Sequence, residues 1–323
     1  MRSDSADCKV LAATLLAFLA AAVDARAVEE GPGDWLQKMA TAVQTTNYEG
    51  TVIRIQDGIA EAIKVVHLVA DGVVRERVIV QEGNGLEIIR NGNEVHCILP
   101  DRKSVLVQEW DDQSTLFSTL PTSDIQFGSE YDVAIVRQDR VAGRQAVMLA
   151  IRPHDGLRYG HRLWLDRETG FPLQTNLIAG DGEAIQQVKF ADIKIGETIH
   201  ASALQPSTNI DDFRWFTEPQ EGRKQEIESD WISNNAPSGF RLTSTHAEES
   251  PGMGGSTKHM LLSDGLANVS VFIAPHNGDA EVRRARVAAS NSFSIAKGEY
   301  RITAVGEVPA ETVEQIARSM QPK

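Results

Sequence analysis

The fold is decided by residues 48–99, YEGTVIRIQDGIAEAIKVVHLVADGVVRERVIVQEGNGLEIIRNGNEVHCIL. Short runs rich in Val and Ile alternate there with the turn signals Asp57-Gly58, Asp71-Gly72 and Asn91-Gly92-Asn93. Such pairs between apolar runs are typical of tight β-hairpins. The pattern therefore predicts an antiparallel meander of five strands. The expected strands are Thr51–Ile55, Ile63–Val69, Arg75–Val80, Leu86–Arg90 and Glu94–Leu99.

The same rhythm continues to about Thr198, which gives roughly ten strands in one large domain. A sheet of this size is long enough to curl. If it stays open, its concave face is an apolar groove suited to a lipid or a peptide, and the alternative is a groove filled by helices. The further strands expected are Tyr131–Arg137, Gln145–Arg152, Tyr159–Asp166, Leu173–Ile178 and Ala184–Ile195.

Two segments are expected to cover this sheet. Residues Asp34–Val43 predict a helix with Asp34 as its N-cap and an apolar face that packs on the sheet. Residues Asp111–Leu120 predict a short helix or loop in the same position. The apolar face of the first helix consists of Trp35, Leu36, Met39 and Val43.

A second domain is predicted after a linker. Residues 201–228 contain Pro206, Pro219 and Gly222 with mixed charges, and they indicate the linker. Residues 229–323 predict a small α+β domain with a terminal helix over Ala310–Met320. Its expected strands are His259–Leu262, Ala267–Ala274, Val282–Ala289 and Tyr300–Val305, with a turn at Asp264-Gly265.

The N-terminus predicts export. Basic residues precede an apolar run from Val10 to Val23, and Ala25-Arg26-Ala27 offers the small residues that a signal peptidase recognises. The run spans about 14 residues, short of the roughly 20 that a membrane-spanning helix needs. We therefore expect a cleaved signal peptide over residues 1–27 rather than the alternative, a membrane anchor.

Charge and cysteine content limit the possible functions. The formal net charge is -13, and such an acidic surface repels nucleic acid. After removal of the leader, Cys97 is the one remaining cysteine, so an internal disulfide is excluded. Because Cys97 lies in the apolar run Val95–Leu99, it is expected to be buried.

No motif predicts catalysis, a metal or a cofactor. The eight histidines are dispersed and form no metal-ligand spacing, and there is no Gly-x-Ser-x-Gly elbow. The paired acids Asp111-Asp112 and Asp211-Asp212 lie in loop-like segments, where solvation accounts for them. These absences favour a protein that binds rather than one that catalyses a reaction.

One basic run is a candidate binding element. Arg283, Arg284 and Arg286 lie on a predicted strand, whose alternation places Arg284 and Arg286 on one face. Guanidinium groups suit carboxylates or phosphates. The alternative is a solvated edge strand protected by its charge.

An ordered set of short motifs resembles the RseB/MucB family across nearly the whole predicted mature chain. Each motif alone is weak, but their order across both domains is specific. The matching residues are Asp34-Trp35-Leu36, Asn47-Tyr48-Glu49, residues 159–166 (YGHRLWLD), Thr169-Gly170-Phe171-Pro172-Leu173, Pro237-Ser238-Gly239-Phe240, Ser263-Asp264-Gly265-Leu266 and Val305-Gly306-Glu307-Val308-Pro309.

This resemblance implies a periplasmic negative regulator of the sigma-E (AlgU-type) envelope-stress response. Such a protein binds the periplasmic part of a membrane-bound anti-sigma factor (RseA/MucA-like) and shields it from a site-1 protease. A lipid or lipopolysaccharide fragment is implied to release the complex, and homo-oligomers are implied as well. The resemblance assigns residues 28–200 to a lipid-sensing domain like LolA and LolB, an open antiparallel β-barrel with helices, and residues 229–323 to anti-sigma-factor binding.

No sequence motif identifies the contact residues, so the residues named here are predictions that rest on the expected function. For the partner we expect the basic strand (Arg283, Arg284 and Arg286) and the linker aromatics Trp215 and Phe216. For the lipid we expect Trp164 and Leu163, one from each face of a strand, with core packing as the alternative. A second possible function is a lipid or lipoprotein carrier of the LolA/LolB type, but a carrier needs no C-terminal domain.

Overall fold

The computed structural model describes residues 30–110, 116–117, 120, 129–217, 225–249, 256–276, 278 and 281–323. The expected signal peptide, residues 1–27, lies outside these ranges, as do Asp111-Asp112 and most of the segment 111–120. Among the helices of the described ranges, none combines the length and apolar character that crossing a membrane requires.

Helix α1, Pro32–Thr45, opens the described chain. Asp34, predicted as its N-cap, instead lies in the first turn, and that prediction was wrong. The Asp34 carboxylate reaches back and accepts a hydrogen bond from the Gly31 N–H at 2.8 Å, so it serves the helix start from inside the helix. The predicted apolar face is confirmed, because its members are all buried: Trp35, Leu36, Met39 and Val43.

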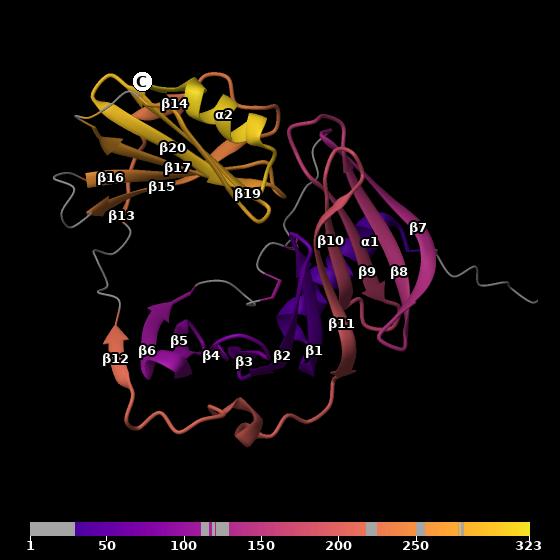
Figure 1. The fold of residues 1–323 in the computed structure, drawn as a ribbon. Helices are drawn as coiled ribbons and strands as arrows, with labels where there is room; N and C mark the ends of the chain where they lie inside the picture. The colour runs from indigo at the N-terminus through magenta and orange to yellow at the C-terminus, as the bar shows by residue number, and fades with distance from the viewer. Residues whose placement is uncertain are drawn as a thin grey trace, which may run out of the picture. The chain divides into compact units, whose positions relative to one another are not determined.

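A twelve-stranded sheet forms the first domain (Figure 1). Its strands are β1 (Tyr48–Gln56), β2 (Ile59–Ala70), β3 (Val73–Val80), β4 (Glu87–Asn91), β5 (Glu94–Leu99), β6 (Ser104–Glu109), β7 (Tyr131–Val141), β8 (Arg144–Pro153), β9 (Gly160–Asp166), β10 (Pro172–Ile178), β11 (Ala184–Ile195) and β12 (Arg214–Thr217). Their order is β12-β6-β5-β4-β3-β2-β1-β11-β10-β9-β8-β7, so the sheet is open, with β12 and β7 at its edges.

The predicted meander is confirmed, and its turns have the expected geometry. Asp57 and Gly58 have φ values of 50° and 77°, which is the geometry of a type I′ turn. That turn sets β1 antiparallel to β2, with Gln56 opposite Ile59. The ten predicted strands correspond to β1 to β5 and β7 to β11.

Strands β6 and β12 were not predicted. β12 lies within residues 201–228, the range expected to be a linker, and it pairs in parallel with β6, with Arg214 opposite Ser104. That range also contains a short 3₁₀-helix, Ala201–Leu204, and ends with β13, Gln225–Glu226. Because β12 is four residues long and its neighbour is distant in sequence, no local pattern indicates it.

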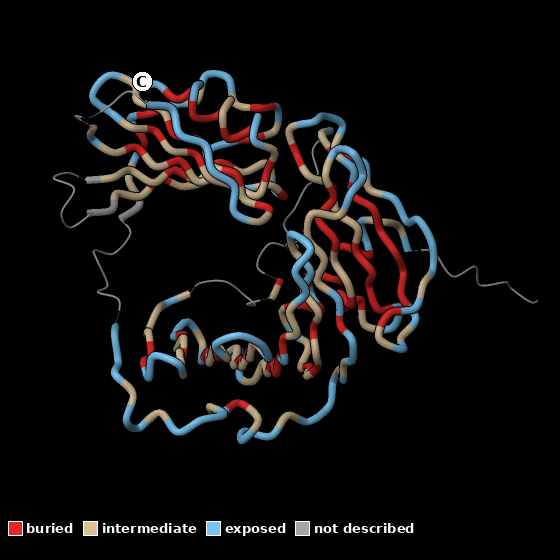
Figure 2. Tube along the Cα trace, viewed as in Figure 1, coloured by how far each residue is buried: buried red, intermediate tan, exposed pale blue. Residues whose placement is uncertain are grey.

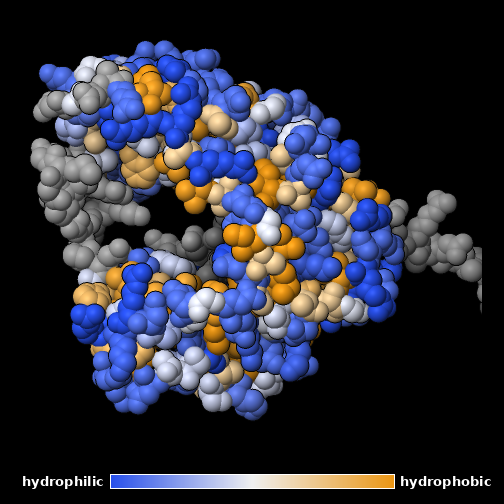
Figure 3. All heavy atoms as spheres, viewed as in Figure 1, coloured by the Kyte–Doolittle hydropathy of each residue, from blue (hydrophilic) through white to orange (hydrophobic). Residues whose placement is uncertain are grey.

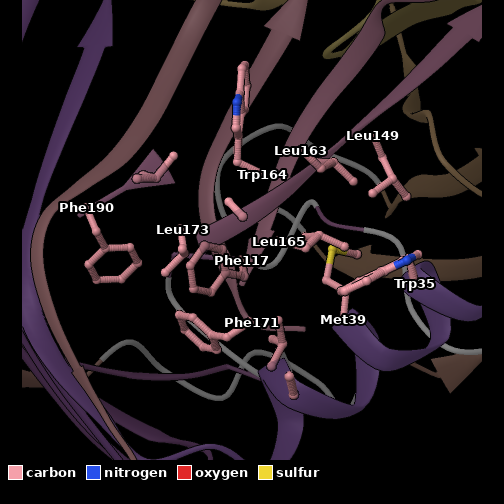
Figure 4. Close-up of a cluster of buried hydrophobic side chains, with 14 of the residues drawn as sticks. Trp35, Met39, Phe117, Leu149, Leu163, Trp164, Leu165, Phe171, Leu173 and Phe190 are labelled. Carbon is pink, nitrogen blue, oxygen red and sulfur yellow. The ribbon is translucent and has the colours of Figure 1, made fainter. Parts of the chain in front are cut away.

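The core of this domain lies between α1 and one face of the sheet (Figures 2 and 4). Leu163 and Leu165 are fully buried on β9 and belong to the same cluster as Trp35 and Met39 of α1. Successive side chains of a strand point to opposite faces, so Trp164 points away from Leu165, as Figure 4 shows, and it too belongs to this buried cluster.

Phe117 is one of the few described residues of the segment expected to cover the sheet. It is 5% exposed, and its ring centroid lies 5.5 Å from that of Phe171 and 6.4 Å from that of Tyr48. Phe190 closes the same group of rings. At Phe117, therefore, the segment packs into the core of the large domain.

A seven-stranded antiparallel sheet forms the second domain. Its strands are β13 (Gln225–Glu226), β15 (Arg241–Glu249), β16 (Ser256–Ser263), β17 (Asn268–Pro275), β18 (Arg283–Val287), β19 (Ser290–Lys297) and β20 (Tyr300–Gly306), in the order β13-β15-β16-β17-β20-β19-β18. A separate pair joins β14 (Trp231–Ser233) to β21 (Met320–Pro322).

Helix α2, Ala310–Ser319, packs on this sheet against β19 and β20. The predicted terminal helix is confirmed, and Val313, Ile316 and Ala317, which share one face of it, are fully buried. Strands β15 and β19 were missed because Ser, Thr and Asn interrupt their apolar residues. The expected class is confirmed: a large open antiparallel sheet with a helix, followed by a smaller α+β domain.

Cys97 lies on β5, and its expected burial was wrong. The residue is half-buried, and its Sγ lies 3.7 Å from the Gln108 Oε1. β5 is separated from the open edge at β12 by β6 alone, so Cys97 lies near the margin of the sheet.

Candidate functional site

The basic strand predicted to bind a partner is β18, at the edge of the second sheet. All five of its residues are exposed, including Arg283, Arg284 and Arg286. β18 pairs with β19 along its inner side, with Arg284 opposite Phe293. Its other side has no neighbouring strand among the described residues, so its backbone is an available edge.

Arg284 is positioned by two contacts. Its guanidinium donates to both oxygens of Glu314 on α2, at 3.1 and 3.0 Å, and lies 5.0 Å from the centroid of the Phe293 ring. Arg318 donates to the same carboxylate at 2.8 Å. These hydrogen bonds hold the pKa of Glu314 below its usual range, so the carboxylate stays ionised and keeps both guanidinium groups in place.

A hollow of about 220 Å³ lies over this edge. Arg284 and Arg286 both line it, as does Ala285 between them. Phe293 and Ala310 supply apolar surface there, and Asn291 an amide. Arg283 lies outside the lining and contacts Glu281 at 3.8 Å. The hollow therefore offers two cations beside an aromatic ring, which suits an acidic side chain with apolar neighbours.

The aromatic residues nominated for the partner lie on β12, at the edge of the large sheet. Trp215 and Phe216 are 49% and 51% exposed. They follow one another on a strand, so they point to opposite faces and both faces of the edge carry an aromatic ring. The Trp215 ring meets the His96 ring edge to face at 5.1 Å. The two groups of nominated partner residues thus lie on the edges of two different sheets.

The residues nominated for lipid contact are both buried. Leu163 is fully buried in the layer beneath α1. Trp164 is 7% exposed on the opposite face, and its indole N–H donates to the Asp139 carboxylate at 3.0 Å. This hydrogen bond contributes to a pKa of Asp139 below its usual range. A lipid role for either residue stays a prediction.

A buried charge network that the sequence analysis missed joins the two domains. Arg158, which is fully buried, contacts the carboxylates of Asp155 and Asp264 and the carbonyl of Ser238. The Tyr131 hydroxyl donates to Asp264 at 2.8 Å. Asp155, Arg158 and Tyr131 belong to the large domain, whereas Asp264 follows β16 of the second. The sequence suggested Asp264-Gly265 as a turn and as part of a family motif, and nothing local indicated its distant partners.

The surroundings of this network alter two pKa values. Burial is the main reason that the pKa of the Tyr131 hydroxyl lies above its usual range, and the Asp264 charge adds to the effect. Burial lowers the pKa of His161 to about 4, although the Asp264 charge acts in the opposite direction. Leu266, two residues after Asp264, is buried in the core of the large domain. The loop after β16 therefore contributes both a charge and an apolar anchor.

The described residues contain no group of three His, Cys, Asp or Glu side chains arranged to hold a metal. Of the paired acids, Asp212 contacts Lys103 at 2.6 Å on the surface. The candidate binding features of the described residues are therefore the exposed edge strands β12 and β18, the hollow over β18 and the buried charge network around Arg158.

Comparison with known proteins covers both domains. The model of the MucB/RseB N-terminal domain matches residues 31–208, and that of the MucB/RseB C-terminal domain matches residues 225–321. The chain is 32% identical over 297 residues to the sigma factor AlgU regulatory protein MucB of Pseudomonas aeruginosa, covering 90% of both chains. It is 26% identical over 293 residues to the sigma-E factor regulatory protein RseB of Escherichia coli K12, again covering 90% of each.

A solved structure also matches most of this chain. The structure of the Pseudomonas aeruginosa MucA/MucB complex matches with a TM-score of 0.71 and 30% identity. The match covers 90% of this chain and 99% of that one.

Proposed function

The chain belongs to the MucB/RseB family, and we propose that it is a periplasmic negative regulator of a sigma-E-type stress response. In this function it binds the periplasmic part of a membrane-bound anti-sigma factor and shields that segment from a site-1 protease. The observation that carries the proposal is the match over both domains to a protein solved in complex with MucA. Residues 1–27 would act as the export signal.

Two edges are proposed as the partner contacts. β18 supplies Arg283, Arg284 and Arg286 for acidic side chains, and β12 supplies Trp215 and Phe216 for apolar ones. An edge strand also offers backbone N–H and C=O groups to an extended peptide. Aromatic and arginine residues are the types that contribute most to binding at protein interfaces. The two edges together suit a partner segment that is extended, acidic and punctuated by apolar residues.

Protection from proteolysis tests this function. The mature protein, residues 28–323, is mixed with the periplasmic segment of the anti-sigma factor and with its site-1 protease. Cleavage should slow in proportion to complex formation and stop at saturation. Full-rate cleavage in the presence of saturating protein would contradict the proposal. An unrelated protein substrate of the same protease serves as control, because its cleavage should be unaffected.

Release of the partner by a lipid or a lipopolysaccharide fragment is the proposed trigger. The large domain would receive it, with Trp164 and Leu163 as the proposed contacts. Both are buried in the described state, so a lipid that reached them would need to displace packed side chains. Titration of the preformed complex with lipid should release the partner from wild-type protein and less readily from Trp164→Phe, which shortens one of the proposed contact side chains and keeps an aromatic ring.

Self-association is the last part of the proposal. We expect the mature protein to form homo-oligomers, as the family resemblance implies. Sedimentation of the mature protein over a range of concentrations measures this directly, and a monomer at every concentration would contradict it.

A further inference from the structure

A second hollow, of about 270 Å³, lies at one end of the large sheet and is not needed for the contacts proposed above. It is lined by the end of β8, the start of β9 and the turn between β10 and β11. Arg152 and Arg162 line it, together with Gly160, Ile178 and Gly180. None of its lining residues belongs to β12 or β18.

The strand register places the two arginines on one face. Arg162 lies opposite Ala150 in the pairing of β9 with β8, and Arg152 is two residues beyond Ala150 on β8. Ile178 lies opposite Gly160 in the pairing of β10 with β9. Residues directly opposite, or two apart on a strand, share a face. The hollow therefore has guanidinium groups on two adjacent strands with an apolar floor between them.

Gly160 contributes only its backbone to that floor. A Cβ at this position would lie 3.0 Å from the Ile151 carbonyl oxygen and 3.4 Å from Pro153, so the neighbouring strand leaves little room for a side chain there.

These two guanidinium groups are available to a ligand. Neither Arg152 nor Arg162 makes an ion pair or a side-chain hydrogen bond within the part of the chain that the structure describes. Arg158 and Asp155 also line the hollow, but they bind each other, and Arg158 binds Asp264 as well. His161, whose pKa is lowered to about 4, adds no charge at neutral pH. The hollow therefore presents two guanidinium groups that bind no carboxylate of the described residues.

We propose that this hollow binds a phosphate monoester group. Two guanidinium charges match the charge of about −1.5 to −2 that a phosphate monoester carries at pH 7, whereas a carboxylate supplies half of it. Gly180 lies at the rim beside open space, since nothing lies within 4 Å of the position that a Cβ would take there. Ala150 and Ile178 would contact the carbon skeleton next to the phosphate. Where the phosphate belongs to a lipid, the inference names a chemical class for the ligand in the proposed release step and rests on that function; phosphate binding itself is measured without the protein partner, so the two can fail separately.

Titration calorimetry of the mature chain with inorganic phosphate tests the site. Wild type should show saturable binding, and Arg152→Ala/Arg162→Ala should bind at least about tenfold more weakly, since each guanidinium–phosphate contact is charge-assisted. The matched control is Arg140→Ala/Arg167→Ala, which removes two exposed arginines of the same domain away from the hollow. Its affinity should stay within about twofold of wild type. Equal losses in the two variants, or no saturable binding by wild type, would overturn the proposal.

A second variant keeps both arginines and blocks the site. Gly180→Glu adds a carboxylate at the rim, where the backbone accepts a side chain, and should weaken phosphate binding about tenfold or more. Gly180→Ala should bind as wild type does. Wild-type affinity in the Gly180→Glu variant would contradict the assignment, provided that its thermal unfolding matches that of Gly180→Ala.

Vesicles identify the source of the phosphate. The protein is sedimented with phosphatidylcholine vesicles that contain or lack phosphatidic acid, whose headgroup is a phosphate monoester. Binding that requires phosphatidic acid and both arginines supports the site with a lipid headgroup as ligand. Binding of inorganic phosphate without vesicle binding supports it with a soluble phosphate as ligand. Vesicle binding that is unchanged in Arg152→Ala/Arg162→Ala, together with unchanged phosphate binding, overturns it.

Discussion

Arg158 and Arg284 both bind carboxylates, but in opposite surroundings. Arg158 is fully buried and contacts two aspartates, whereas the side chain of Arg284 is 58% exposed and contacts Glu314 on the surface. A buried charge that loses its partner is costly, while an exposed one is hydrated at little cost. The comparison separates arginines that hold the structure together from arginines that can exchange one partner for another.

The largest effect on stability should come from removing a carboxylate partner of the buried Arg158. Asp264→Ala leaves the guanidinium of Arg158 buried with one carboxylate fewer and removes a hydrogen-bond acceptor from Tyr131. We expect the free energy of unfolding to fall by about 3–5 kcal/mol, as for other buried pairs that lose one partner. Chemical denaturation followed by tryptophan fluorescence measures this.

The double variant Arg158→Ala/Asp264→Ala sharpens that result. It removes both charges, so no unpaired ion stays buried, and it should be less destabilised than the sum of the two single variants. Additive losses would mean that the two charges do not stabilise each other.

Acidification should lower the stability of the folded chain through His161, which lies beside the same network. Its pKa is about 4 in the folded chain and near 6.5 when unfolded, so folding favours the neutral form. As pH falls from about 6.5 to 4, the unfolded chain binds a proton that the folded chain does not, and stability declines by at most about 3 kcal/mol. Melting temperatures between pH 7 and 4 should show this slope in wild type and in His200→Gln, an exposed control, but less of it in His161→Gln.

Substitution of the exposed arginines of β18 should change the affinity for the partner and leave the fold intact. Arg284→Glu/Arg286→Glu should weaken binding of the anti-sigma segment by about 2 kcal/mol, roughly thirtyfold, because it turns attraction into repulsion. Binding by wild type should also weaken as salt increases. Fluorescence anisotropy of a labelled partner segment measures both, and equal affinity in the variant would remove β18 from the interface.

The smallest effect is that of Arg284→Ala on stability. The pair with Glu314 is solvent-exposed, and Arg318 contacts the same carboxylate, so the free energy of unfolding should change by less than about 1 kcal/mol. A loss close to that of Asp264→Ala would mean that Arg284 is structural and unavailable to a partner.

The sequence predicts what adjacent residues decide. Asp57-Gly58 indicates its hairpin because two residues contain the whole geometry of the turn. The faces of α1 and α2 likewise follow from apolar spacing within one helix. Arg158 and Asp264 meet across 106 positions, so no window of sequence contains both. β15 and β19 are strands because their neighbours complete the sheet, in spite of their polar residues.

The candidate sites likewise include features that adjacent residues predict and features that depend on distant residues. The alternation along β18 predicts that Arg284 and Arg286 share a face, and both line one hollow. Which side of β9 faces α1 is not encoded locally, so Leu163 and Trp164 could only be nominated together. The hollow at Arg152 and Arg162 depends on the register of three strands. Register arises from pairing between distant residues, which a single sequence does not display.

The parallel pairing of β12 with β6 affects the order in which the chain folds. Arg214 lies opposite Ser104, 110 positions earlier, and β7 to β11 lie between them in sequence. Closing so long a loop is entropically costly, so these four residues should join last and leave first during transient opening. The amides of Trp215 and Phe216 would then exchange with deuterated solvent sooner than those of β1. If β12 detaches while the rest of the sheet stays folded, Trp215 and Phe216 can pair with a partner segment in more than one register.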